Sequence, residues 1–227
     1  PEKIDFELRL RDGPFNVTDT PPLKIDARYL FGAVGSNLAI EGEVKLAAAR
    51  ELAGYPDFVF GATDDVFSTR YETISNAGET AADGSKLLNL NMPPVEDVSK
   101  PLEMTAVIRL RAGSGRPVER RVSAPVLPGR AMIGIKPMFD GNLAEGSEAE
   151  FQIIAVGADG ARIVMQDVRW EINRLHTRYQ WYQQYGSWNY EPTTRRERIA
   201  AGDAEIGAQA ALNIASAVEW GEYELKL

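Results

Sequence analysis

Residues 168–190 read VRWEINRLHTRYQWYQQYGSWNY, and they hold three of the chain's four tryptophans and four of its eight tyrosines. Val168, Trp170 and Ile172 alternate with polar residues, which is typical of a half-buried β-strand. The alternation resumes further along, and the sequence Tyr-Gly-Ser at 185–187 provides a turn. The stretch therefore predicts a β-hairpin with cross-strand aromatic pairs, around which the second half of the chain is built.

Two interpretations of this hairpin are open. In the first, its aromatic side chains form an exposed platform for a carbohydrate, a nucleic acid or a protein partner. In the second, the hairpin covers the end of a β-sandwich core. Because large aromatic side chains are mostly buried, we expect Trp170, Tyr179, Trp181 and Trp188 to be chiefly structural. If Trp181 and Trp188 instead line an outer face, they become candidate contacts with a neighbouring domain.

The rest of the chain repeats the alternating pattern. Many short one-sided stretches separated by Gly, Pro, Asn and Asp turns predict an all-β protein built from antiparallel sandwiches. The clearest predicted strands cover residues 4–10, 23–29, 38–46, 58–60, 104–110, 118–126, 131–135, 151–156 and 223–227. Residues 208–218 are ambiguous between strand and helix, and the small, polar stretch 77–83 predicts a mobile loop.

The chain has 227 residues, enough for two domains of ordinary size. Two prolines and a glycine interrupt the strand pattern at 125–129, and a new apolar stretch begins at Ala131. We therefore expect two tandem antiparallel β-sandwich domains, residues 1–129 and 130–227. A start at Pro1 rather than Met further suggests a piece of something longer.

Composition excludes several classes of function. The formal net charge is −8 and the pI is near 4.9, which argues against a nucleic-acid-binding surface. The densest basic run, Arg-Arg-Glu-Arg at 195–198, is interrupted by a glutamate and is typical of a solvated strand face. Absence of cysteine excludes disulfides, thiolate metal sites and a cysteine nucleophile within these residues. No apolar run is long enough to span a membrane as a helix.

No set of residues supports catalysis or ligand chemistry. His176 is the only histidine, and no nucleophile motif accompanies it. Asp64 and Asp65 lack the spacing of a calcium loop, and Glu41 and Glu43 are more typical of the wet face of a sandwich. We therefore expect a non-enzymatic protein with no catalytic, cofactor-binding or metal-binding residue and no cofactor.

Three stretches resemble bacterial α2-macroglobulins. Residues 25–46, IDARYLFGAVGSNLAIEGEVKL, are similar to that family's Arg-Tyr-Leu strand, Gly-Ala turn, Asn-Leu pair and Gly-Glu strand. Residues 168–192 are similar to its tryptophan- and tyrosine-rich hairpin, which ends in Trp-x-Tyr-Glu, and residues 133–141, IGIKPMFDG, also match. The resemblance implies two consecutive macroglobulin-like domains, of the immunoglobulin or fibronectin III kind, placed before the bait region.

The resemblance also implies a function for a longer parent chain. Members of the bacterial α2-macroglobulin family are broad protease inhibitors of the periplasm or cell envelope and are often lipid-anchored. A protease cuts the bait region of such a protein and is then trapped. The implied partners of this segment are the parent's other domains, target proteases reached through the bait region, and a penicillin-binding protein. No bait or thioester residue can be assigned here. The alternative interpretation is a surface-exposed or secreted β-sandwich adhesin or carbohydrate-binding module that uses the aromatic hairpin.

Overall fold

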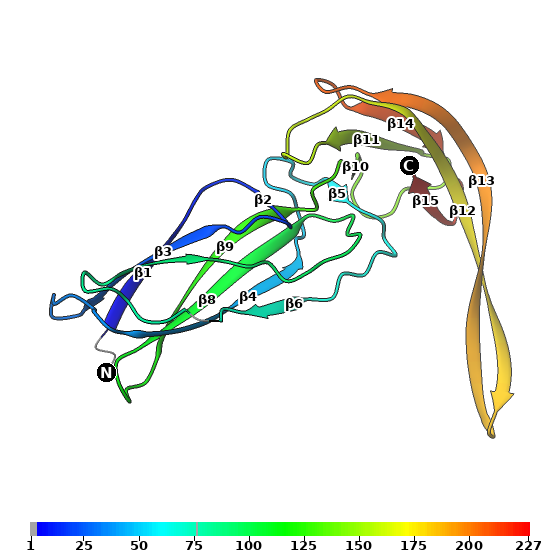
Figure 1. Ribbon diagram of the computed structural model, residues 1–227. Helices are drawn as coiled ribbons and strands as arrows, with labels where there is room; N and C mark the ends of the chain where they lie inside the picture. The colour runs from blue at the N-terminus through cyan, green and yellow to red at the C-terminus, as the bar shows by residue number, and fades with distance from the viewer. Residues whose placement is uncertain (1–3, 76) are drawn as a thin grey trace. The chain divides into compact units, whose positions relative to one another are not determined.

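The structure, a computed structural model, describes residues 4–75 and 77–227, and every regular element in these ranges is a β-strand. The all-β fold class expected from the alternating pattern is therefore confirmed (Figure 1). The chain divides into two compact units. The first consists of Pro1–Met132 and Gly157–Ala161, and the second of Ile133–Val156 and Arg162–Leu227.

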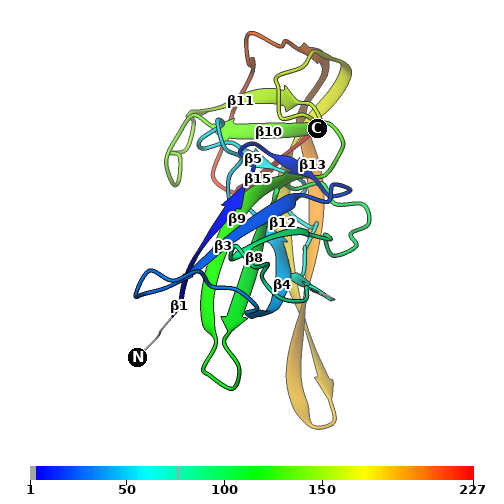
Figure 2. The ribbon, with the colours of Figure 1, turned by 60° about the vertical axis from the view of Figure 1, so that its left-hand side comes forward.

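The first unit is a two-sheet sandwich. Three strands form one sheet in the order β1-β3-β7, and five form the other in the order β2-β9-β8-β4-β6. Figure 2 shows the long strands of both sheets running side by side. These eight strands are β1 (Ile4–Leu10), β2 (Phe15–Asn16), β3 (Pro22–Tyr29), β4 (Ala39–Ala48), β6 (Arg70–Thr73), β7 (Ser85–Asn89), β8 (Leu102–Arg111) and β9 (Val118–Leu127). The short strand β5 (Val59–Phe60) also lies in this unit but in neither of these two sheets.

Strict alternation creates the core of this unit. In β3, Leu23, Ile25 and Ala27 are buried, whereas Lys24 and Arg28 face solvent. The same period in β4 and β8 buries a second set of apolar side chains, and the two sets meet between the sheets. The pairing is antiparallel, as expected, except that the short β2 runs parallel to β9.

The segment 77–83 is anchored to the first unit, although its composition predicts a mobile loop. The side chain of Thr80 is only 2% exposed. Its hydroxyl accepts a hydrogen bond from the backbone N–H of Leu38 at 2.9 Å and donates one to the backbone oxygen of Gly35 at 2.6 Å. Ala77 is also buried. This segment therefore supplies partners to backbone groups of the chain entering β4.

The second unit is also built from two layers. In one sheet β14, β11 and β10 lie in that order, and in the other β13, β12 and β15 do. The strands are β10 (Met132–Pro137), β11 (Glu148–Val156), β12 (Met165–Gln184), β13 (Ser187–Ile206), β14 (Leu212–Ala217) and β15 (Glu222–Lys226). The ambiguous stretch 208–218 thus contains a strand. The core of the second unit includes Ile153, Val168, Ile172, Ile206 and Ile214.

Candidate functional site

The aromatic hairpin predicted from the sequence is present and is longer than expected. β12 and β13 each contain 20 residues and pair antiparallel along their whole length. Tyr185 and Gly186 form the two-residue loop, with φ angles of 50° and 80°. Positive φ at both central positions is the geometry of a type I′ turn, whose twist matches that of the paired strands. In Figure 1 the two strands form a long twisted ribbon that leaves the rest of the second unit.

The proximal half of the ribbon belongs to the core of the second unit. Val168 and Ile172 are buried, and Trp170 packs against the same cluster. Trp170 pairs directly with Gly202 on β13, and a Cβ atom added to Gly202 would lie 3.0 Å from the indole ring. The ring therefore occupies the space above a residue that has no side chain. For Trp170 the expected structural role agrees with this packing.

The distal half of the ribbon does not cover a core, which corrects the expectation for the other three aromatic residues. The exposed fractions of Tyr179, Trp181 and Trp188 are 60%, 65% and 68%. The physical reason is that β15 pairs with β12 only along residues 171–175, so beyond them the ribbon has no third strand and no core to cover within the described part of the chain. Trp181 also lies on the opposite face of β12 from Trp170, because the two are an odd number of positions apart and side chains alternate along a strand.

These exposed aromatic side chains share one face of the ribbon. Directly opposite residues in an antiparallel pair lie on the same face. Tyr179 pairs with Pro192, Trp181 with Tyr190, and Gln183 with Trp188. The positions of Tyr179, Trp181 and Trp188 thus form an apolar surface near the tip, and Tyr185 in the turn is 98% exposed.

We define the distal ribbon as residues 173–198, the part beyond the register shift that separates Ile172 from Asn173. It contains five arginines, two glutamates and no lysine or aspartate, a formal charge of +3. The whole chain carries −8, so the remaining residues carry −11. The distal ribbon is thus a basic and aromatic element in an acidic protein.

Some of these charges are already paired at the base of the distal ribbon. Arg174 forms an ion pair with Glu219 at 3.0 Å, and Arg196 forms one with Glu224 at 2.7 Å. Within the described ranges, no ion pair involves Arg178, Arg195 or Arg198. Three guanidinium groups are therefore available to an external acidic partner.

His176 lies in the distal ribbon, and its Nε2 is 2.7 Å from Oε2 of Glu197 on the paired strand. The hydrogen bond with His176 holds the pKa of Glu197 below its usual value. His176 is thus held by a local hydrogen bond across the ribbon. Nucleophilic catalysis would need a serine, threonine or cysteine in contact with the imidazole ring, and the hydrogen-bond partner of His176 is instead the carboxylate of Glu197.

The carboxylates considered in the sequence take part in local structural contacts. Asp65 accepts hydrogen bonds from the hydroxyl and the backbone N–H of Ser99, which lower its pKa. Glu41 and Glu43 form ion pairs with arginines of β8, Arg111 at 3.4 Å and Arg109 at 3.3 Å. Across residues 4–75 and 77–227, no three histidine, aspartate or glutamate side chains gather as metal ligands would.

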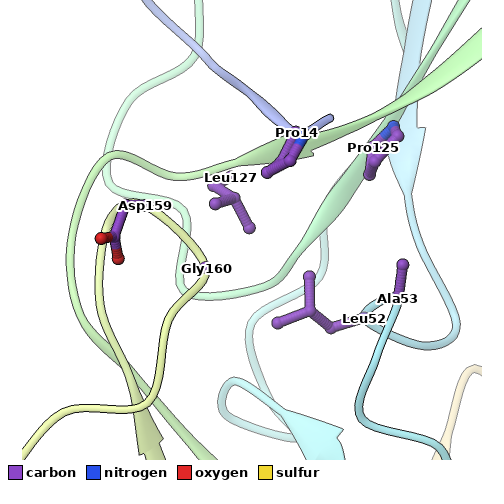
Figure 3. Close-up of a pocket in the computed structure, with 7 residues that line it drawn as sticks. All are labelled: Pro14, Leu52, Ala53, Pro125, Leu127, Asp159 and Gly160. Atoms are coloured by element: carbon purple, nitrogen blue, oxygen red, sulfur yellow. The ribbon is translucent and has the colours of Figure 1, made fainter. Parts of the chain in front are cut away.

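A hollow of about 170 Å³ lies in the first unit (Figure 3). Leu52 and Leu127 point toward it, whereas the carboxylate of Asp159 points away. The remaining lining residues are Pro14, Ala53, Pro125 and Gly160. Pockets that bind drug-sized ligands are usually about 300–1,000 Å³ and contain several convergent polar groups. This hollow has neither property, so the distal ribbon is the stronger candidate for function.

Comparison with known proteins decides the family. Residues 2–128, more than half of the chain, match the family described as the bacterial alpha-2-macroglobulin MG5 domain. The chain belongs to the bacterial alpha-2-macroglobulin family. Residues 134–227 match bacterial macroglobulin domain 6. The distal ribbon lies within this domain 6 match.

Curated bacterial alpha-2-macroglobulins align with the whole chain. The alpha-2-macroglobulin of Xylella fastidiosa (strain 9a5c) is 28% identical over 236 residues, which cover 100% of this chain and 14% of the relative. The alpha-2-macroglobulin of Escherichia coli (strain K12) is 22% identical over 244 residues, which cover 100% of this chain and 15% of the relative. This chain, with its two macroglobulin domains, therefore spans only a small part of the relatives' length.

Solved alpha-2-macroglobulin structures share the fold. A mutant of the Salmonella alpha-2-macroglobulin matches with a TM-score of 0.73 and 22% identity, covering 99% of this chain and 16% of that chain. The Escherichia coli alpha-2-macroglobulin activated by porcine elastase matches with a TM-score of 0.65 and 23% identity, covering 99% and 20%. Both confirm the macroglobulin β-sandwich fold.

Proposed function

We propose that this chain is a structural scaffold segment of a bacterial α2-macroglobulin-like protease inhibitor. In this proposal the two domains, residues 1–129 and 130–227, hold other parts of a longer parent chain in place. A bait region elsewhere in the parent is cut by a target protease, which the parent then traps. The segment itself contributes no catalytic residue, cofactor or metal ligand.

One observation carries this proposal. Two consecutive macroglobulin domain families, MG5 and domain 6, match consecutive parts of the chain, and whole alpha-2-macroglobulins align with all of it. A relative from Escherichia coli has been described as activated by porcine elastase. A protein of this type exposes a bait region for a protease to cut. In this proposal, the domains that precede the bait region form a rigid support for it. Two sandwiches with continuous apolar cores fit such a scaffold.

The test compares the parent protein with the 227-residue segment. Each is incubated with elastase, and the remaining elastase activity on a large protein substrate is measured. We expect the parent to inhibit the protease and the folded segment to have no effect. Stoichiometric inhibition by the segment alone would contradict the scaffold role, and a parent that leaves elastase fully active would contradict the protease-inhibitor function.

The proposal also extends to location and partners. By family membership we place the parent in the periplasm or outside the cell, with a lipid anchor on the membrane and a penicillin-binding protein as a further partner. Within residues 4–75 and 77–227 there is no helix of the length and apolarity needed to cross a bilayer. Fractionation of cells that produce the tagged parent, with and without a signal-peptidase inhibitor, tests this location.

The exposed aromatic face favours one second candidate, a carbohydrate-binding or adhesive module. Tyr179, Trp181 and Trp188 share a face, and stacking on aromatic rings is a common mode of sugar recognition. Binding of the segment to a glycan array, lost in the double variant Trp181→Ala/Trp188→Ala, would support this candidate. We expect no such binding.

A further inference from the structure

The distal ribbon is poorly supported by the unit that carries it. β15 pairs with β12 only along residues 171–175, and β13 is an edge strand of its sheet. From His176 to Arg195 the described chain forms a two-stranded ribbon with two open edges. An isolated two-stranded hairpin is marginally stable in water, and stable ones pack a face against another element.

The surface of the distal ribbon has the composition of an interface. Tyr, Trp and Arg are the residues most enriched at the centres of protein interfaces, and Lys and Asp are depleted there. The distal ribbon contains five arginines, three aromatic side chains on one face, and no lysine or aspartate. A merely solvated extension would need charges on both faces and few large aromatic side chains.

The charge of the distal ribbon selects the chemistry of the partner. Arg178, Arg195 and Arg198 lie outside the ion pairs at the base of the ribbon, and the formal charge of this part is +3. Complementary potentials across an interface favour an acidic partner. Nucleic acid is disfavoured because Glu191 and Glu197 interrupt the arginines and the rest of the chain carries −11.

We propose that the distal ribbon docks on an acidic face of another domain of the same parent chain, with Trp181 and Trp188 buried in the contact. This inference rests on the proposed function, because it needs a parent much longer than this segment. The segment spans only 14–15% of the length of its curated relatives, so most of such a parent lies outside these residues. A domain tethered by a short flexible linker has an effective concentration of about 1 mM. A small interface is therefore enough to keep the distal ribbon docked.

Site-specific photo-cross-linking in the purified full-length parent tests this docking. The photoreactive amino acid p-benzoylphenylalanine replaces Trp188, or Tyr185 in the turn. The matched control replaces Trp220, which is 80% exposed but lies outside the distal ribbon. After irradiation, mass spectrometry identifies the cross-linked peptides. We expect an intrachain cross-link from Trp188 to an Asp- and Glu-rich peptide outside these 227 residues, and no link from Trp220 to that peptide.

Charge reversal then tests the electrostatic part. Arg198 pairs with Asn173 and therefore lies on the same face of the ribbon as Trp181. Because like charges across an interface are strongly disfavoured, the substitution Arg198→Glu should lower the yield of the cross-link about tenfold. Arg169→Glu is the matched control, since Arg169 lies in the proximal half of the ribbon and pairs with Asp203. That variant should keep the original yield.

Three results would overturn the docking proposal. These are a cross-linked species of twice the parent's mass, absence of any protein cross-link from both ribbon positions, and a cross-link whose yield is unaffected by Arg198→Glu. The same preparations are assayed for protease inhibition. A parent that inhibits elastase without the cross-link refutes docking alone, and one that forms the cross-link without inhibiting elastase refutes the proposed function alone.

Discussion

The indole ring of Trp170 lies directly over Gly202, its cross-strand partner, with ring atoms 3.0 Å from the position that a Cβ would occupy. Aromatic side chains that cover a glycine on the neighbouring strand are one way in which sheets fix their register. Trp170 and Gly202 lie in the proximal half of the ribbon, which belongs to the core of the second unit.

Adding a methyl group at Gly202 should therefore destabilise the second unit. Gly202→Ala forces the indole ring of Trp170 to move by a few tenths of an ångström, and crowding of this kind costs about 1–3 kcal/mol. Gly207→Ala is the matched control, because a Cβ there makes ordinary contacts at 3.4 Å with the backbone of Ala210. Urea unfolding should show a lower midpoint for the first variant, and equal midpoints would contradict the packing.

Removing the hydroxyl of Thr80 should destabilise the first unit. Thr80→Val keeps the shape of the side chain but leaves the N–H of Leu38 and the backbone oxygen of Gly35 without their partner, and each such buried group costs about 1–3 kcal/mol. Thr105→Val is the control, because its bond to Ser123 is exposed. A loss no larger than that of the control would mean that segment 77–83 is not anchored through Thr80.

The ion pairs on the outer face of the first unit predict a pH dependence. Hydrogen bonds from Arg121 and then Arg109 lower the pKa of Glu119 below its ordinary value of 4.5. A carboxylate with a lowered folded-state pKa stabilises the protein above its unfolded pKa, and this stabilisation is lost as the pH falls through the folded pKa. Stability contributed by Glu119 should thus decline below about pH 4.5.

The measurement is the urea midpoint from pH 6 down to pH 3. Glu119→Gln should show a shallower decline over the acidic part of this range than the unchanged protein. Glu103→Gln serves as the control, because Glu103 is exposed and forms no ion pair among the residues that the structure describes. Parallel curves for Glu119→Gln and the unchanged protein would exclude the predicted contribution.

Two separately produced fragments test the domain boundary that we propose at residues 129 and 130. The buried cluster of the first unit lies entirely between Ile4 and Val126, and that of the second lies beyond residue 130. Each fragment therefore keeps its own core. We expect 1–129 and 130–227 each to unfold cooperatively in urea. If either fragment lacks a cooperative transition while the intact chain has one, the boundary does not separate two independently folding domains.

Alternation in the sequence predicted the strands because each strand has one buried face, as Leu23 and Ile25 show in β3. The two-residue strand β2 is too short to produce a period, whereas β5 lies within the predicted strand 58–60. The exposure of the distal ribbon does not follow from its aromatic content, because large aromatic side chains are mostly buried. The available signal was spacing: Trp170 and Trp181 cannot share a face of one continuous strand. Thr80 gave no such signal, because its burial depends on residues 42 to 45 positions away.

The division of the ribbon into a core half and an outward half is the central structural claim, and two tryptophan truncations test it most directly. Trp170→Ala removes a ring that packs against the core cluster of the second unit, so we expect a loss of about 3 kcal/mol, the lower end for large aromatic residues because the ring is partly buried. Trp181→Ala removes a ring that is 65% exposed and should cost less than about 1 kcal/mol. The difference between the two urea midpoints is the decisive quantity. A large decrease for Trp170→Ala with a small one for Trp181→Ala is the predicted result, and equal decreases, or a larger one for Trp181→Ala, would contradict the claim.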